Sequence, residues 1–502
     1  MDADLGPPRG VADALLASGR DEDVAIVEAG RRYTYAELRA AVERLASQLA
    51  ALGLPHEPRI GILGPNSFFW VASYLAALKL GVAVPLSDKL AGDELRAQAD
   101  WVDCVALMMD QRLVRRVGAA FGTRPVITQA QLEQSDGVPW AGRIVDEAAD
   151  AVLILTSGTT SEPKAVRLTH TNLLANTRSI VSYLRLEPSD RMLVILPLHY
   201  CYGASLLHTH LAVGASLVFC NTFAFPQTAV DLIDRERCTG FAGVPSTFQL
   251  LMRASSYPHH RLPSLRKVQQ AGGRLAPSMI EAVAAAQPHS QFFVMYGQTE
   301  ATARLSYLPP EFLHEKLGSV GRGVPGVDLQ VVDEAGKPAP VGQIGEIVAR
   351  GASISPGYYN DPVGSAAKFA GGALRTGDLA TVDDDGFIYI VGRSGDFIKS
   401  WGHRVSSPQV EAAGLQLPGV TEAAAIGLPD DAAGEAIALA LTLAPGHVLD
   451  ARTARARLSQ WLPKHAVPET VHVLDAFPLN AAGKVSKRAL RELLEQDGGQ
   501  VQ

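Results

Sequence analysis

The middle of the chain alternates short apolar runs with amphipathic segments, and this alternation limits the possible folds most strongly. Ala151–Thr156 is a short run rich in β-branched residues, and His170–Leu184 carries apolar side chains at helical spacing. Arg59–Leu63 followed by Phe68–Leu80 repeats the pattern nearer the N-terminus. Strands that alternate with helices favour layered α/β structure with largely parallel sheets.

The same pattern continues through the following 150 residues or so. Predicted strands are Met192–Leu196, Ser216–Phe219, Phe241–Val244, Leu265–Gln270 and Gln291–Met295, and predicted helices are Pro226–Arg237 and Pro245–Ala254. Each of these two helices opens with a proline, which the first helical turn tolerates.

The pattern changes after about Gly326. Val327–Val332, Gly345–Ala349 and Phe387–Val391 are short apolar runs separated by Gly, Pro and Asp, which predicts a small antiparallel sheet or barrel. A domain boundary is expected near Gly392–Asp396, with a compact α+β domain of about 100 residues beyond it.

We therefore expect an α/β protein with two domains. Residues 1–394 form a large N-terminal domain of layered α/β subdomains with a small β-barrel-like subdomain, and residues 395–502 form a small, mobile α+β C-terminal domain.

Composition and charge exclude several classes of protein. The 502 residues carry a formal charge of −7, which argues against a large nucleic-acid interface. The four cysteines form no CxxC pair and no zinc-site spacing, so we expect core thiols in a reducing compartment. No secretory signal or long uncharged apolar run is visible, which predicts a soluble cytoplasmic protein without a membrane span.

A hydroxyl-rich loop follows the strand at Ala151–Thr156. Thr156-Ser-Gly-Thr-Thr-Ser-Glu-Pro-Lys164 places five hydroxyl groups beside a glycine and a lysine. Backbone N–H groups and hydroxyls can wrap an oligophosphate while the lysine supplies positive charge, although Ser/Thr/Gly surface turns are common. The loop is not a GxxxxGK[ST] P-loop.

This loop resembles the signature of the adenylate-forming superfamily, which holds acyl-CoA synthetases, peptide-synthetase adenylation domains and luciferases. Other segments resemble further motifs of that family and stand in the same order: Tyr296-Gly-Gln-Thr-Glu300, Arg375-Thr-Gly-Asp378, Gly392-Arg-Ser-Gly-Asp396 and Asn480-Ala-Ala-Gly-Lys484. The joint order of these motifs is far more specific than any one of them.

The resemblance implies a nucleotide site and its catalytic groups. Thr299 would contact phosphate, Glu300 would coordinate Mg²⁺ through its hard carboxylate oxygens, and Lys484 would bridge the attacking carboxylate and the α-phosphate. The implied nucleotide-binding positions are Thr156, Ser157, Gly158, Thr159, Thr160, Lys164, Tyr296, Gly297, Asp378, Ile390 and Arg393.

Two positions depart from the family pattern. Ser161 replaces the second glycine of the phosphate loop, which removes backbone freedom and adds a hydroxyl. Gly395 occupies the hinge position, which is often Asp or Lys in the family, so domain rotation is expected to persist but to be less bistable. Lys399–Arg404 resembles the loop that enters the active site for thioester formation.

The resemblance places the acid pocket between the segment after Met192–Leu196 and the strand end near Gly272. His199 would gate the pocket or take part in catalysis. No aspartate lies in His199–His210 to pair with an α-ammonium group, which favours a plain carboxylic acid, of aryl or short functionalised type. The pocket candidates are Tyr202, Gly203, Val244, Phe248, Gln270, Gly272 and Gln298.

The expected reaction is ATP-dependent activation of a carboxylic acid as acyl-AMP with Mg²⁺, followed by transfer to the thiol of CoA. Alternatives are transfer to the phosphopantetheine thiol of a carrier protein, transfer of the AMP ester to another nucleophile, and adenylation of a non-acyl oxyanion such as nitrite. A non-catalytic nucleotide-binding protein is disfavoured, because every motif retains its charged residue. The acid, the acceptor and the oligomeric state stay open at this stage.

Overall fold

The structure is a computed structural model that describes residues 10–134, 146–156, 164–393, 397–430, 432–444, 446–478 and 485–497. The chain divides into two compact units. One comprises Met1–Gln330 with Val348–Arg375, and the other comprises Val331–Ile347 with Thr376–Gln502. The boundary expected between residues 394 and 395 remains a prediction.

The first unit contains a nine-stranded sheet. Its strands are β1 (Val24–Glu28), β2 (Arg31–Thr34), β9 (Arg191–Val194), β10 (Ser216–Phe219), β11 (Gly240–Gly243), β12 (Lys267–Gln270), β13 (Gln291–Tyr296), β14 (Ser306–Leu308) and β15 (Arg322–Gly323). They follow the order β15-β14-β13-β12-β11-β9-β10-β1-β2. The run from β13 to β1 is parallel, so the carboxyl ends of its strands share one edge.

A seven-stranded sheet forms the other half of this unit. Its strands are β3 (Arg59–Leu63), β4 (Val82–Leu86), β5 (Cys104–Met109), β6 (Val126–Ile127), β7 (Asp150–Thr156), β8 (Lys164–Thr169) and β18 (Gly357–Tyr358), in the order β18-β8-β7-β4-β3-β5-β6. β7, β4, β3, β5 and β6 are parallel, whereas β8 turns back against β7 and β18 pairs antiparallel with β8.

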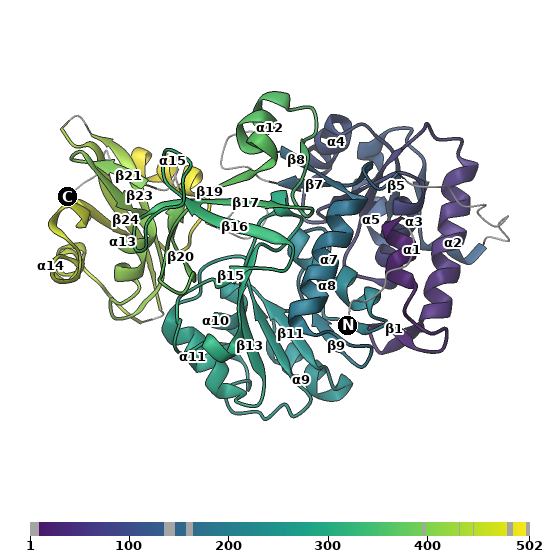
Figure 1. Ribbon diagram of the computed structural model, residues 1–502, viewed down its shortest axis with the longest axis horizontal. Coiled ribbons are helices and arrows are strands. Elements are labelled where there is room, and N and C mark those ends of the chain that lie inside the picture. The colour runs from purple at the N-terminus through teal and green to yellow at the C-terminus, as the bar shows by residue number, and fades with distance from the viewer. Residues whose placement is uncertain are drawn as a thin grey trace. The chain divides into compact units, whose positions relative to one another are not determined.

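One hydrophobic core joins the two sheets through the helices between them. Figure 1 shows α7 (His170–Leu184) and α8 (Cys201–Ala212) in this middle layer, and α1 (Val11–Leu16), α2 (Tyr35–Ala51) and α3 (Phe68–Leu80) contribute to the same core. α3 is apolar all round and buried except at Lys79, as expected of a helix enclosed by protein. Thr169 and Asn172 form a capping box that starts α7.

Further helices cover the outer faces of the two sheets. α4 (Gly92–Trp101) and α5 (Gln111–Val117) pack on the seven-stranded sheet through a second apolar cluster. α9 (Gln227–Glu236), α10 (Pro245–Ala254) and α11 (Pro277–Ala286) accompany the nine-stranded sheet (Figure 1). The first unit is therefore a stack of helix and sheet layers, which confirms the predicted α/β architecture.

A four-stranded sheet supplies the small β part of the fold. Its strands are β16 (Val327–Val332), β17 (Gly345–Gly351), β19 (Leu374–Val382) and β20 (Ile388–Arg393), in that order. The boundary between the units runs through β16, β17 and β19.

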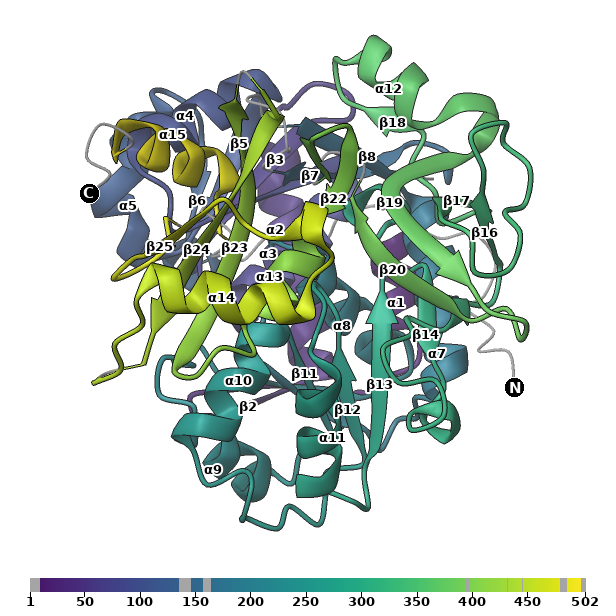
Figure 2. The ribbon, with the colours of Figure 1, turned by 90° about the vertical axis from the view of Figure 1, so that its left-hand side faces the viewer.

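The remainder of the second unit is α+β, as predicted. Its sheet has the order β22-β21-β24-β23, with β25 paired to β24. α13 (Ser407–Gly414) and α14 (Ala451–Trp461) pack on one face, and α15 (Lys487–Asp497) packs on the other (Figure 2). The strands are β21 (Phe397–Ser400), β22 (His403–Ser406), β23 (Val420–Asp430), β24 (Gly434–Leu443) and β25 (Thr470–Val473).

No helix in the described parts of the chain combines the length and the apolarity needed to cross a membrane.

Candidate active site

The two ends of the hydroxyl-rich loop lie together. Thr156 ends β7, Lys164 begins β8, and the two residues are paired across the antiparallel strands. The Thr156 hydroxyl donates to the Lys164 carbonyl oxygen over 3.3 Å. Ser157, Gly158, Thr159, Thr160 and Ser161 lie outside the described residues.

The ammonium group of Lys164 lies beside an aromatic ring and a carboxylate. Its Nζ is 4.4 Å from the centre of the Tyr358 ring and 3.5 Å from Oδ2 of Asp361. A cation over an aromatic face is attracted by the electron density of the ring, so Tyr358 helps to hold this positive charge in place.

Tyr358 also contacts the carboxylate that is expected to bind a metal. Its hydroxyl donates to Oε1 of Glu300 over 2.9 Å. Burial and the nearby Glu300 carboxylate raise the pKa of Tyr358, which keeps the phenol protonated and able to donate. Lys164 and Glu300, predicted from two separate motifs, are thus joined through one tyrosine.

The sequence motifs did not single out Tyr358 or Asp361. Both belong to Gly357-Tyr-Tyr-Asn-Asp-Pro362, whose signal was a pair of tyrosines in an otherwise turn-forming segment. β18 brings this segment alongside β8, and Asp361 caps α12 (Pro362–Lys368) by accepting from the Gly364 N–H. A pairing so distant in sequence is visible only in the folded chain.

The Tyr296–Glu300 motif is fixed by close backbone packing. A side chain at Gly297 would come within 1.9 Å of the Ala303 carbonyl oxygen, so only glycine fits. Thr299 starts a short 3₁₀ turn, and its hydroxyl donates to the Cys201 sulfur over 3.4 Å. The Glu300 carbonyl accepts from the Ser355 N–H over 2.9 Å.

In the second unit, Asp378 and Arg393 form an ion pair. They lie opposite each other on β19 and β20, and Arg393 Nε donates to Oδ1 of the buried Asp378 over 2.8 Å. Ile390 pairs with Ala380 on the same two strands. The predicted catalytic Lys484 lies outside the described residues.

His199 lies in the segment that follows β9 and is buried. Its ring contacts Tyr200, with the ring centres 4.3 Å apart. Burial, with a smaller contribution from Lys89, lowers the pKa of His199 to about 4, so the imidazole is neutral near pH 7. Asn66 anchors this segment, since its amide donates to Leu196 and accepts from the Leu198 N–H.

The predicted acid-pocket residues lie at or after the carboxyl ends of β9, β11, β12 and β13. The Tyr202 hydroxyl donates to the Gln269 carbonyl over 3.0 Å. A side chain at Gly203 would come within 2.1 Å of the Pro197 carbonyl oxygen, and one at Gly272 would come within 2.9 Å of Val244. Glycines therefore let these segments approach closely.

The other three predicted pocket residues differ in their surroundings. Gln270 donates to the Gly273 carbonyl over 2.8 Å. Gln298 has a buried amide nitrogen with no hydrogen-bond partner among the described residues. Phe248 is fully buried and packs edge-on against Phe241 and Phe292, which is a core contact.

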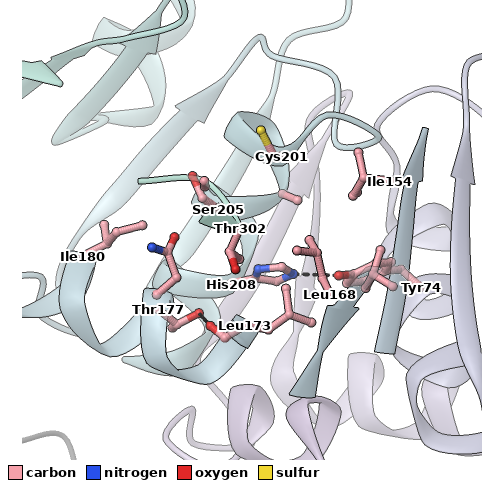
Figure 3. Close-up of a pocket in the computed structure, with 14 residues that line it drawn as sticks. Tyr74, Ile154, Leu168, Leu173, Thr177, Ile180, Cys201, Ser205, His208 and Thr302 are labelled. Carbon is pink, nitrogen blue, oxygen red and sulfur yellow. Dashed lines mark hydrogen bonds between the residues drawn. The ribbon is translucent and has the colours of Figure 1, made fainter. Parts of the chain in front are cut away.

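A separate cavity lies between the α7–α8 pair and the seven-stranded sheet (Figure 3). None of the predicted pocket residues lines it. Cys201, Ser205 and His208 line it from one face of α8, and the His208 Nε2 is 2.8 Å from the Tyr74 hydroxyl. Cys201 connects this cavity to Thr299, because its sulfur accepts a hydrogen bond from the Thr299 hydroxyl.

Comparison with known proteins identifies the family. The sequence matches the AMP-binding enzyme family over residues 16–359 and the AMP-binding enzyme C-terminal domain over residues 409–484. The chain belongs to the AMP-binding enzyme family. The predicted family and the predicted class, an AMP-forming ligase, are confirmed.

Relatives of this AMP-binding enzyme include several ligases. The chain is 31% identical to indoleacetate–CoA ligase of Aromatoleum aromaticum, over 92% of this chain and 94% of that one. It resembles o-succinylbenzoate CoA synthetase of Bacillus subtilis in complex with its acyl-adenylate (28% identity, TM-score 0.88, 96% and 98% coverage). It also resembles the amide bond synthetase McbA of Marinactinospora thermotolerans (29% identity, TM-score 0.88, 96% and 99% coverage).

The carboxylate chemistry of this AMP-binding enzyme suits a metal that is shared with a substrate. Within the described residues, no three or more His, Cys, Asp and Glu side chains gather to hold a metal ion. Glu300 instead presents a single carboxylate that is already oriented by Tyr358. Mg²⁺ is commonly held by one or two carboxylates together with phosphates and water, so this site fits Mg²⁺.

Proposed function

We propose that the enzyme activates a carboxylic acid with ATP and Mg²⁺, forms the acyl-AMP ester with release of pyrophosphate, and transfers the acyl group to the thiol of CoA. The observation that carries the proposal is the contact chain Lys164–Tyr358–Glu300 in a protein of the AMP-binding enzyme family. ATP with magnesium occupies the o-succinylbenzoate CoA synthetase in another structure of that relative.

The first unit supplies groups for the oligophosphate. Lys164 provides positive charge beside the hydroxyl-rich loop, and Glu300 is the Mg²⁺ ligand. Bound Mg²⁺ would neutralise phosphate charge as the bond to the leaving pyrophosphate breaks. Tyr358 orients the Glu300 carboxylate from outside the metal's own ligand set, a role that commonly tunes metal affinity.

The family resemblance assigns further residues to the nucleoside and to the reacting centre. Asp378 accepts from the ribose hydroxyls, while Arg393 holds that carboxylate in place and reaches the ribose or the α-phosphate. Ile390 packs near the nucleotide. Lys484 places its charge between the attacking carboxylate and the α-phosphate, where negative charge shifts in the transition state.

The acid lies at the carboxyl edge of the nine-stranded sheet, beside Tyr202 and Gly272, where ligands commonly bind in open α/β sheets. His199 lies in the adjoining segment and remains uncharged near neutral pH. A neutral side chain at this place does not compete with the cationic groups for the acid.

CoA is the proposed acceptor because the relatives include a CoA ligase and a CoA synthetase. The amide bond synthetase among the structural relatives favours a second candidate, in which the AMP ester passes to an amine. A carrier-protein thiol is a third acceptor with the same first half-reaction.

Pyrophosphate release measured across a panel of carboxylic acids, with and without CoA, tests the proposal. We expect at least one acid to stimulate release, CoA to be converted to a thioester, and Lys484→Ala to reduce adenylation strongly. Thioester formation with free CoA would exclude strict dependence on a carrier protein. If no acid stimulated release, or if Lys484→Ala left release unchanged, the proposal would be wrong.

A further inference from the structure

Arg304 is buried in the layer between the nine-stranded sheet and the middle helices. It is 1% exposed and follows the Thr299–Glu300 turn closely in the sequence. Its Nε donates to the Tyr183 hydroxyl of α7 over 3.1 Å, and its guanidinium carbon lies 4.8 Å from the centre of the Tyr202 ring of α8. The guanidinium therefore touches Tyr202, which belongs to the predicted acid pocket.

This buried cation has no counter-charge among the residues that the structure describes. Other buried charges of the described chain are paired, such as Lys267 with Asp190 at 2.7 Å and Glu236 with Arg32 at 2.6 Å. No carboxylate in the described residues pairs with Arg304, and its buried Nη2 has no hydrogen-bond partner there. Burying a charge without an opposite charge beside it is costly, and an anion bound next to the guanidinium would offset that cost.

Neighbouring polar groups lack partners in the same way. Both amide atoms of the Gln269 side chain are buried without a hydrogen-bond partner among the described residues. Gln269 belongs to the same group of residues as Arg304, Tyr183 and Tyr202. Its backbone carbonyl accepts a hydrogen bond from the Tyr202 hydroxyl. It also pairs across the sheet with Phe293, whose ring lies near that of Tyr183. An anion that accepted from Arg304 and the Gln269 amide would satisfy donors that the protein leaves unpaired.

The Arg304 side chain extends away from Glu300. The Arg304 carbonyl accepts from the Asn176 side chain in the middle of α7, whereas its guanidinium reaches Tyr183 near the end of that helix. These contacts are separated by two helical turns, or about 10 Å along the axis. Nearer its start, Asn172 of α7 donates to the Ala352 and Ile354 carbonyls, in the segment that also contacts Glu300.

We propose that Arg304 binds a second anionic group of the acid substrate, so that the enzyme activates dicarboxylic acids or acids with an equivalent distal anion. This inference rests on the proposed adenylation function, in which the reacting carboxylate lies toward Thr299 and Glu300. The relatives include ligases named for a diacid and for a monoacid, since o-succinylbenzoate carries two carboxylates and indoleacetate carries one.

Matched pairs of substrates test the inference without any mutation. Dicarboxylic acids of increasing chain length, and aryl diacids, are each compared with their monomethyl esters in the pyrophosphate-release assay. The ester keeps the length and the reacting carboxylate but removes the distal charge. We expect the best diacid to exceed its ester in kcat/KM by ~30-fold or more, as for loss of a hydrogen bond to a buried charged group.

Arg304→Met then tests whether this residue reads the distal charge. In this variant, the ratio of kcat/KM for the diacid to kcat/KM for its ester should fall toward one. Arg304→Lys should keep part of the preference for the diacid. Lys267→Met is the matched control, because it breaks another buried ion pair of the same sheet, the pair with Asp190. It should lower thermal stability while leaving the diacid-to-ester ratio of kcat/KM unchanged.

The outcomes separate the two proposals. If the kcat/KM values of wild-type enzyme for the esters equalled those for the diacids, the inference about Arg304 would be overturned and the adenylation function would stand. If no acid of either kind stimulated pyrophosphate release, the adenylation function itself would fail. A diacid preference that survived unchanged in Arg304→Met, folded as judged by its thermal unfolding, would also overturn the assignment.

Discussion

The hydroxyl of Tyr358 donates to Oε1 of Glu300 over 2.9 Å, while the ring of the same tyrosine lies 4.4 Å from the ammonium of Lys164. One side chain therefore orients an expected Mg²⁺ ligand and holds an expected phosphate-binding cation. Because β18 pairs with β8, this tyrosine is fixed by the same strand that begins at Lys164.

Replacing Tyr358 by Phe should raise the Mg²⁺ concentration needed for activity. The ring contact with Lys164 stays, but the Glu300 carboxylate loses the donor that orients it, and loss of such an outer partner commonly costs about 10-fold or more in metal affinity or activity. ATP–pyrophosphate exchange measured against Mg²⁺ concentration gives the shift. Tyr359→Phe is the control, since that hydroxyl donates to Asp103 instead; equal shifts in both variants would contradict the role of Tyr358.

Replacing Lys164 by Met should raise KM for ATP by about 10-fold or more, because a charge-assisted contact to phosphate is lost. Methionine keeps an unbranched apolar side chain of similar length at this half-buried position, so the fold should persist. The control is Asp361→Asn, which retains an oxygen to cap α12 and removes only the carboxylate charge 3.5 Å from Lys164. Unchanged KM for ATP in Lys164→Met would remove Lys164 from the phosphate site.

The sequence predicted the layered fold and several element bounds well, for physical reasons that differ between parts of the chain. His170–Leu184, Pro245–Ala254 and Phe68–Leu80 are helices with the predicted bounds, because apolar spacing and capping signals are local. Tyr358 entered no motif, because its contact with Glu300 spans 58 residues and depends on strand pairing.

The surroundings of single pocket residues depend on packing that the sequence does not show. Phe248 packs against the rings of Phe241 and Phe292, and its place in the acid pocket stays a prediction. Arg304 was not singled out, because a lone arginine in a sequence gives no sign of burial. Its burial without a carboxylate partner among the described residues emerges only from the packing of α7 and α8 around it.

Replacing Asp378 by Asn should raise KM for ATP by about 10-fold while leaving KM for the acid nearly unchanged. The substitution keeps the shape of the side chain but removes the charge that pairs with Arg393 and is proposed to accept from the ribose. Steady-state kinetics with each substrate varied in turn separates the two effects. Asp383→Asn is the control, since this carboxylate accepts from the Phe387 N–H in the turn before β20 and from the Tyr389 hydroxyl. Parallel changes in both KM values would argue for a general structural defect.

The free energy of unfolding should decrease as the pH is lowered, because four histidines are buried. Burial lowers the pKa of His170, His199, His208 and His210 from 6.5 to about 4. Between these values the unfolded chain binds protons that the folded chain excludes, so the free energy of unfolding decreases as the pH falls from 6.5 toward 4. Each histidine should contribute on the order of 1–2 kcal/mol to the loss between pH 7 and pH 5.

His208→Gln should reduce the loss of unfolding free energy between pH 7 and pH 5 by the contribution of one histidine. Glutamine can keep a hydrogen bond to the Tyr74 hydroxyl, which lies 2.8 Å from His208 Nε2, but it takes up no proton. Urea unfolding of wild type and variant at pH 7 and pH 5 gives the difference. Tyr74→Phe breaks the same hydrogen bond without changing proton uptake, so it should lower stability equally at both pH values. An identical loss between pH 7 and pH 5 in wild type and His208→Gln would show that protonation of the unfolded chain at this residue does not drive the effect.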